Sequence, residues 1–462
     1  MSYSSRMTDT EGVMWRLESD PQMSSNFGTI TLLDRSPDFD LFRERLLGAS
    51  LRMPRLRQRV RPVPGNLGAP FWVPDTDFDI DHHVRHVALP PPSDERALCD
   101  LATAITSDPF DRSRPLWRFT VVDGLTGGRA ALVQKLHHTI ADGESGVQLA
   151  LEYLDLERDA VPPPLPDPDE IDEARERLDA DLEAADQVRA ALTGALRVPL
   201  GVLEQVRDLL ADPIRIPAAT RDAADGVRAI MTQLGDTDAA RSPLWTERST
   251  RRHLETATAP FEGMKAAARH LGGTLNTAFM TVASEAAGRY HRELGAPVES
   301  LRSSMAISTR QADSGANAFS LVRLLVPTSE MSIDERFRAI HEATHAALDA
   351  ASSGATLDRL AALAATLPTP VVTHLARQQA QTIDFATSNV KGSPVPMYLA
   401  GAQLIGNFPI GPLSGVAFNL TLLSYLGRLD MGLNCDAAAI SRPDLLRRFV
   451  DDAVNDLVRV AD

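Results

Sequence analysis

Residues 129–143, with the sequence RAALVQKLHHTIADG, decide how the first half of the chain folds. The run 130–136 is typical of a strand, and it leads directly into two adjacent histidines, His137 and His138. Asp142-Gly143 is a turn dipeptide, and apolar side chains follow it at helical spacing. The sequence therefore predicts a strand, a tight turn and a helix that frame the two histidines.

The two histidines cannot have equal roles. Neighbouring side chains on a strand point to opposite faces, so only one of them can face a given cavity. Histidine is well suited to take a proton from a hydroxyl near neutral pH and to return it to a leaving group. One base and one packing histidine is the division that we expect. A buried pair that only satisfies local hydrogen bonds is the alternative, and the Asp142-Gly143 turn weighs against it.

The chain has 462 residues, which suits two domains. Residues 1–165 mix strand-like runs such as 119–122 with helical stretches such as 39–50, so they predict an α/β lobe. A Pro-rich, acidic stretch opens the second segment, 166–240, which has no good strand and is expected to be a helical connector. Residues 241–462 predict a second α/β lobe, with helices at 263–271, 277–294, 333–350 and 445–460 and strands at 305–309, 321–326, 420–425 and 429–433.

Charge and composition exclude several classes of function. The formal net charge of −15 repels nucleic acid, so any anionic ligand must be held by a local cluster of arginine or lysine. Cys99 and Cys435 have no CxxC spacing, which argues against a disulfide framework or a thiolate zinc site and fits an intracellular compartment. The uncharged stretch 392–427 contains four prolines, so we expect buried strands and turns there and no membrane helix.

Several short motifs accompany the HHxxxDG string, and together they carry a resemblance. The sequence resembles the bacterial wax ester synthase/diacylglycerol acyltransferase family, within the superfamily that includes chloramphenicol acetyltransferase and peptide-synthetase condensation domains. The resemblance covers nearly the whole chain. The matching pieces are PRLRQR (54–59), FWV (71–73), VRHV (84–87), DRSRPLW (111–117), SNV (388–390), YLAG (398–401), PIGPL (409–413) and LSYLGRL (423–429).

The resemblance implies two chloramphenicol-acetyltransferase-like lobes, with a tunnel between them for acyl-CoA and an acceptor alcohol. It makes His138 the general base and leaves His137 to pack on the opposite face. Asp142 would hold the loop and Gly143 would permit its turn. Arg57 stands where related folds place the partner of that aspartate, which suggests an ion pair. Acyl-CoA is then a co-substrate, and no bound cofactor is expected.

Other site residues are implied in the second lobe. The family has an Asn-Asp pair, whereas here Asn276 is followed by Thr277, so the role of the aspartate is in doubt. Asn276 either keeps a substrate or loop contact or caps the next helix. Thr387, Ser388 and Asn389 are candidates to stabilise the oxyanion or contact substrate, although they equally fit an ordinary polar turn.

Some patterns match other kinds of site, but the rest of the sequence does not support those sites. Residues 341–345 match HExxH, but the chain lacks the further residues of a zinc protease, and no metal is expected. The histidines at 82, 83 and 86 are interpreted as a solvated strand edge, and the arginines at 52, 55, 57, 59 and 61 as a solvated face. The chain has no GxSxG elbow, which favours direct transfer in a ternary complex over an acyl-enzyme.

The expected activity is transfer of a long acyl chain from CoA to diacylglycerol or a fatty alcohol. A catalytically weakened lipid-binding or lipid-droplet protein of the same fold is the alternative, and an acceptor that is polar or carrier-bound is a third reading. The expected location is cytoplasmic. The apolar residues within 192–210 suggest either packing on the lobes or peripheral contact with a membrane or lipid droplet.

Overall fold

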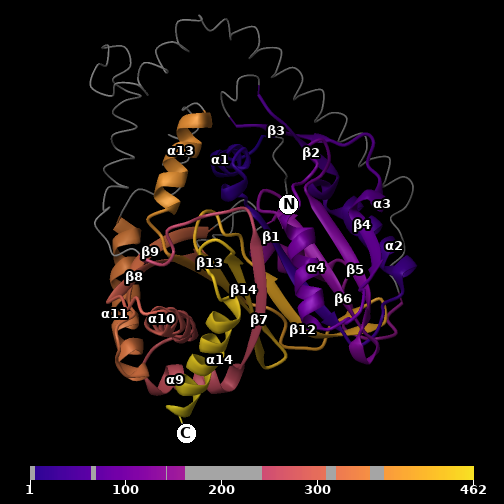
Figure 1. Ribbon diagram of the computed structural model, residues 1–462. Helices are drawn as coiled ribbons and strands as arrows, with labels where there is room; N and C mark the ends of the chain where they lie inside the picture. The colour runs from indigo at the N-terminus through magenta and orange to yellow at the C-terminus, as the bar shows by residue number, and fades with distance from the viewer. Residues whose placement is uncertain are drawn as a thin grey trace, which may run out of the picture.

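Two six-stranded sheets, each with helices packed on it, make up the computed structural model of the protein (Figure 1). The structure describes residues 6–63, 69–141, 143–161, 242–308, 319–353 and 369–461. The linker and helical connector predicted between the lobes lie almost wholly in 162–241, outside the described residues. The α/β fold class with two lobes is confirmed.

The first sheet holds the histidine pair. Its strand order is β11 (Tyr398–Leu399), β12 (Ala402–Ile410), β1 (Asn26–Leu33), β6 (Arg129–His137), β5 (Trp117–Leu125) and β4 (Val84–Ala88). Helix α4 (Glu95–Ser107) packs on one face through Leu98, Cys99 and Ala102. Helices α2 (Phe39–Arg52) and α5 (Gly143–Leu151) cover the other face through side chains that include Phe42 and Leu149. Burial on both faces fixes where the ends of β6 and β1 lie.

The second sheet has the order β7 (Arg252–Pro260), β14 (Arg428–Asp436), β13 (Phe418–Tyr425), β10 (Phe385–Val390), β8 (Ser300–Ser308) and β9 (Phe319–Pro327). Its apolar core is shared with α9 (Phe261–His270), α10 (Leu275–Glu293), α11 (Ile333–Ser353) and α14 (Pro443–Arg459). Figure 1 shows these helices grouped around α10. Helix α10 is buried along most of its length, because α9, α11 and α14 all contact it.

One segment of the second half of the chain joins the first sheet. Strands β11 and β12 lie within the predicted third segment, 241–462, yet β12 pairs antiparallel with β1, so that segment supplies strands to both sheets. Strand β12 also passes close to β14. A side chain at Gly432 would place its Cβ 1.8 Å from the carbonyl oxygen of Pro409, so only glycine allows this approach.

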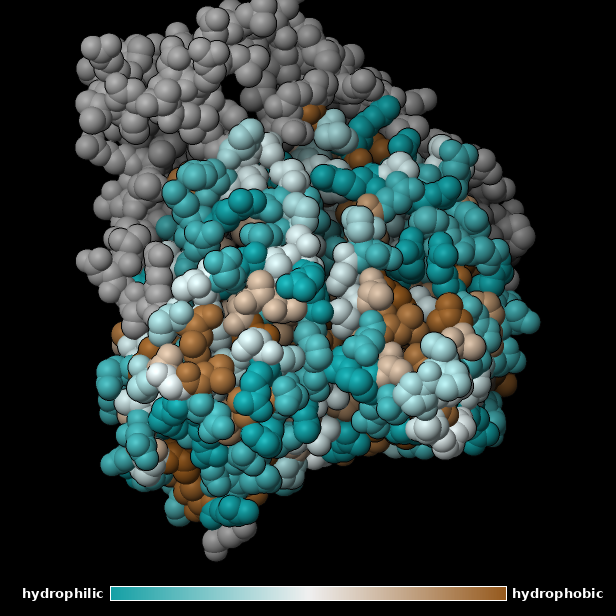
Figure 2. Space-filling view, viewed as in Figure 1, coloured by the Kyte–Doolittle hydropathy of each residue, from teal (hydrophilic) through white to brown (hydrophobic). Residues whose placement is uncertain are grey.

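The predicted helices and strands of the two lobes are present, with ends that differ by a few residues. The uncharged stretch 392–427 contains the whole of β11, β12 and β13, which confirms the prediction of buried strands and turns. Among the described helices none is long and apolar enough to cross a membrane. On the face shown in Figure 2, hydrophobic residues form small separate patches within a mainly hydrophilic surface.

Smaller elements border the first sheet. Helix α1 (Asp9–Leu17) begins with a capping box in which Thr8 and Glu11 each accept a hydrogen bond from the other's backbone N–H. Helix α13 (Thr369–Ala380) packs against α1. Strands β2 (Gln58–Arg61) and β3 (Phe71–Pro74) form a separate two-stranded sheet, and α3 (Ile80–His83) leads into β4.

Candidate active site

The histidine pair lies where β6 ends between its two neighbours. The backbone N–H of His137 donates to the carbonyl of Leu116, just before β5, at 3.0 Å. The N–H of His138 donates to the carbonyl of Ser25, just before β1, at 3.1 Å. The N–H of Ile140 then returns to the carbonyl of His137 and closes a turn. These bonds fix the backbone of both histidines against the first sheet.

His137 is fixed in one tautomer. The backbone N–H of Thr139 lies 3.1 Å from Nδ1 of His137, and because an amide N–H can only donate, Nδ1 must accept. The ring proton is therefore on Nε2, which donates to Oε1 of Glu18 at 3.2 Å. The ring is only 2% exposed. His137 thus has both nitrogens occupied inside the protein, which suits a positioning residue.

Glu18, just after α1, is a site residue that the sequence reasoning missed. Its Oε1 also accepts from the backbone N–H of Ser25 at 2.6 Å and from the hydroxyl of Ser24 at 3.0 Å. Burial alone would raise the pKa of Glu18, but its interaction with His137 and the hydrogen bonds from the two serines outweigh burial and leave the pKa below its ordinary value. Glu18 therefore ties the start of β1 to the end of β6.

Replacing Glu18 with glutamine should make the free energy of unfolding less dependent on pH in the acid range. A carboxylate with a lowered pKa adds stability above the ordinary glutamate pKa of about 4.3, and that gain disappears as pH falls through the folded value. We expect Glu18→Gln to lower the free energy of unfolding by about 1–2 kcal/mol at pH 7, with the difference shrinking below about pH 4.3 and vanishing once the pH is below the lowered pKa of the folded carboxyl. Urea unfolding over this pH range measures it. The exposed Glu293→Gln serves as the control, and an equal loss at every pH would contradict the assignment.

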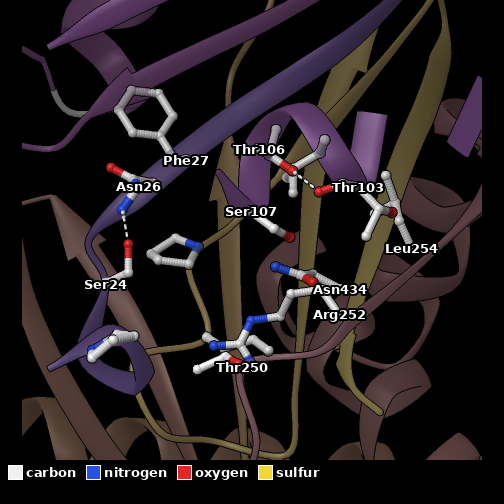
Figure 3. Close-up of a pocket in the computed structure, with 14 residues that line it drawn as sticks. Ser24, Asn26, Phe27, Thr103, Thr106, Ser107, Thr250, Arg252, Leu254 and Asn434 are labelled. Atoms are coloured by element: carbon white, nitrogen blue, oxygen red, sulfur yellow. Dashed lines mark hydrogen bonds between the residues drawn. The ribbon is translucent and has the colours of Figure 1, made fainter. Parts of the chain in front are cut away.

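His138 faces a different environment from His137. Its side chain is half-buried, and its ring lies 4.6 Å from the ring of Phe27, centre to centre, at an angle of 38°. Phe27 in turn lines a cavity at the junction of the two lobes (Figure 3). His138 is not among the residues that line this cavity, but its ring packs against Phe27, which is one of them.

The cavity has a volume of about 90 Å³, and both polar and apolar side chains line it. Figure 3 shows Thr103, Thr106 and Ser107 of α4 on one side of the cavity and Thr250 and Arg252 on the other. Asn26 of the first sheet and Asn434 of the second sheet also line it. Arg252 is also held by Asp436, so its charge is compensated. The walls thus offer neutral hydrogen-bonding groups to whatever enters.

The other predicted residues of the first lobe are only partly described. Asp142 lies outside the described residues, so the Asp142 to Arg57 ion pair stays a prediction. The guanidinium of Arg57 lies 4.6 Å from the centre of the Phe78 ring. Gly143 begins helix α5. Helix α5 therefore begins at the end of the HHxxxDG string, where the sequence predicts a helix.

In the second lobe, Met305 links Asn276 to the 387–389 segment. Nδ2 of Asn276 lies 2.8 Å from Sδ of Met305, and Met305 pairs in register with Thr387. Ser388 and Asn389 follow on β10. Thr274, and not Asn276, caps α10, so the capping alternative for Asn276 is wrong.

Two further groups of histidines were noted in the sequence, at the HExxH stretch and near residue 83. His341 and His345 lie side by side on α11, but the described residues contain no group of three or more histidine, cysteine or acidic side chains that could hold a metal. His83 corrects one expectation. It is fully buried, stacks on Trp117 and bonds the Trp117 carbonyl, and burial lowers its pKa to about 4, so it is not on a solvated edge.

The expected solvated face of arginines is also only partly correct. Arg55 is 6% exposed and its guanidinium lies 4.1 Å from the centre of the Trp72 ring. Arg52, by contrast, is at the surface and pairs with Glu152. The fold therefore buries some of these arginines and leaves others at the surface.

Known proteins resemble this chain along its whole length. Residues 7–279 match the family model of the wax ester synthase/diacylglycerol acyltransferase catalytic domain, and residues 315–457 match that of the WS/DGAT C-terminal domain. A putative diacylglycerol O-acyltransferase of Mycobacterium tuberculosis is 31% identical, over 99% of this chain and 93% of that protein. A second one from the same organism is 29% identical, over 89% of this chain and 88% of that protein.

Two solved structures have a similar fold. The wax ester synthase/diacylglycerol acyltransferase from Marinobacter aquaeolei VT8 superimposes with a TM-score of 0.68 at 22% identity, covering 99% of both chains. The first condensation domain of the calcium-dependent antibiotic synthetase superimposes with a TM-score of 0.57 at 15% identity, covering 100% of this chain and 97% of that one.

Proposed function

Because the chain belongs to the wax ester synthase/diacylglycerol acyltransferase family, we propose that it transfers a long acyl chain from acyl-CoA to the hydroxyl of diacylglycerol or a fatty alcohol. Membership of this family makes the protein an acyltransferase. The donor, the acceptor and the residues that act are the proposal. Triacylglycerol or a wax ester is then the product, and contact with a membrane or lipid-droplet surface would bring the enzyme to such substrates.

His138 acts as the general base. It takes the proton of the acceptor hydroxyl while the alcohol oxygen attacks the thioester carbonyl. Collapse of the tetrahedral intermediate breaks the carbon–sulfur bond, forms the ester, and lets the imidazolium return the proton to the CoA thiolate. The observation that carries this assignment is the difference between the two rings. His137 has both nitrogens bonded within the protein, whereas His138 is half-buried against a residue of the cavity wall.

Residues of both lobes would support His138 in this reaction. Asp142 and Gly143 shape the loop after the base, with Arg57 as the proposed partner of Asp142. The carbonyl oxygen becomes negative during attack and needs a donor nearby. Thr387, Ser388 and Asn389 are the proposed donors or substrate contacts, and Asn276 lies beside them through Met305. Closure of the two lobes on substrate would have to bring this group to the reacting carbonyl.

Direct transfer in a ternary complex is supported by the cysteines, and no bound cofactor is needed. Cys99 and Cys435 are both buried, and burial raises the pKa of Cys99 to about 12, which disfavours a thiolate nucleophile. Incubation with radiolabelled palmitoyl-CoA in the absence of alcohol tests this. We expect no label on the denatured protein, and stoichiometric labelling that chases into ester on addition of alcohol would show an acyl-enzyme instead.

A lipid-binding protein without turnover is the second candidate, and one observation favours it. Thr277 stands where the family has an aspartate, and its buried hydroxyl bonds Thr274 and His341 in place of a charge. The site therefore lacks one carboxylate that relatives of this type carry. Release of the CoA thiol only when an alcohol is present separates an enzyme from a binding protein.

A further inference from the structure

A second cavity, of about 340 Å³, lies beside the C-terminal end of α1. Its walls come from four parts of the chain, namely Trp15 and Arg16 of α1, Val60 and Pro62 at the end of β2, Arg112, and Thr369 at the start of α13. Figure 1 shows α1 and α13 on the same side of the molecule, and the two helices are in contact. No element of this wall is shared with the cavity of Figure 3.

Two arginines give this cavity a positive charge. The guanidinium carbon of Arg112 lies 3.5 Å from the centre of the Trp15 ring, and its Nη2 donates to the Trp15 carbonyl at 3.0 Å. Within the described ranges no carboxylate comes within ion-pair distance of Arg112. Arg16 is only 4% exposed, and burial lowers its pKa although Asp9 acts against the shift. A chain with a net charge of −15 thus places two cations at one cavity.

A third group points to a ligand independently of the arginines. Oγ1 of Thr369 is buried, and among the described residues it has no hydrogen-bond partner. Buried hydroxyls are rarely left unpaired, because each loses its bonds to water. Ser19 adds a second hydroxyl to the same wall. Two guanidinium groups and two hydroxyls form a donor-rich set that suits an anion with several acceptor oxygens.

We propose that this cavity binds a phosphate group carried by one of the two substrates. Ser19 lines it and directly follows Glu18, which bonds His137, so Glu18 connects the cavity wall to one histidine of the pair. The stacked Arg112 presents a planar fork to phosphate oxygens, and Arg16 supplies a fixed charge behind it. The phosphate belongs either to the nucleotide part of the acyl-CoA donor or to a phosphorylated lipid alcohol. This identification rests on the proposed function, whereas phosphate binding itself does not.

Calorimetric titration of the full chain tests the site with two probes at constant ionic strength. Adenosine 3′,5′-bisphosphate represents the nucleotide part of CoA, and glycerol 3-phosphate represents a phosphorylated acceptor. We expect one of them to bind the wild-type protein and Arg112→Gln to weaken that binding about tenfold or more, since a charge-assisted bond to phosphate is lost. Thr369→Val should weaken it less. Arg459→Gln, an exposed arginine on α14, should leave it unchanged.

The outcome also identifies the substrate. Binding of the bisphosphate alone assigns the cavity to the donor, and binding of glycerol 3-phosphate alone assigns it to the acceptor. Binding of both leaves a phosphate site that is open to either substrate. Absence of binding for both probes, or equal affinities of the wild type and Arg112→Gln, would overturn the proposal. Ester formation is measured separately, so failure here would leave the acyltransferase proposal standing.

Discussion

His138→Ala should lower kcat/KM for acyl transfer by about 10²–10⁴-fold, which is the range that a positioned general base contributes. The measurement is thiol release from palmitoyl-CoA in the presence of a long-chain alcohol. The half-buried ring packs on Phe27, so its removal should cost little stability, and circular dichroism and the thermal midpoint should stay near those of the wild type. The loss would then be one of chemistry and not of folding.

His270→Ala is the matched control, because His270 is exposed at the end of α9 in the second lobe. It should retain wild-type kinetics. A His138→Ala protein that keeps a third or more of the activity would remove the base assignment, and a variant that loses its folded signal would require His138→Gln in its place.

Glu285→Ala should cause the largest loss of stability, about 3–5 kcal/mol. Glu285 on α10 is 4% exposed and forms an ion pair with Arg336 of α11, which is fully buried. Arg289 and Arg292 bond the same carboxylate. Removing the carboxylate leaves the Arg336 charge buried between α10 and α11 without its counter-ion, and that uncompensated charge is the physical cause of the loss.

Urea unfolding followed by circular dichroism measures this effect. Glu262→Ala is the control, because Glu262 pairs with Lys265 at the surface of α9, with 75% of its side chain exposed, and should change stability by less than about 0.5 kcal/mol. A loss below about 1 kcal/mol for Glu285→Ala would mean that the lobe relaxes around Arg336 or admits water there.

Local sequence patterns were sufficient to predict most helices and strands of the two lobes. The strand-like run 130–136 predicts β6, and the helical spacing over 333–350 predicts α11. The pairing of β12 with β1 could not be predicted in this way. The register joins Gly28 to Ile410, and nothing in either strand alone specifies a partner so far along the chain.

The residues of the candidate site could also be predicted only in part from the sequence. The HHxxxDG string marks His137 and His138, but the residue that holds His137 is 119 positions away. Glu18 carries no local signal, since a glutamate after a short helix is ordinary on a protein surface. His83 shows the reverse error, because its charged neighbours in the sequence suggested solvent, while the fold places its ring on Trp117. Both cases depend on which distant segments meet, and alternation or spacing does not encode that.

The most direct test of acyl transfer to a lipid alcohol is a reaction of the purified full chain with palmitoyl-CoA, with and without diacylglycerol or hexadecanol. Free thiol and ester product are quantified together, the ester by mass spectrometry. We predict that thiol and ester appear in equal amounts and only when an alcohol is present. Folded protein that releases no thiol with either alcohol, or that releases thiol without forming ester, would contradict the account.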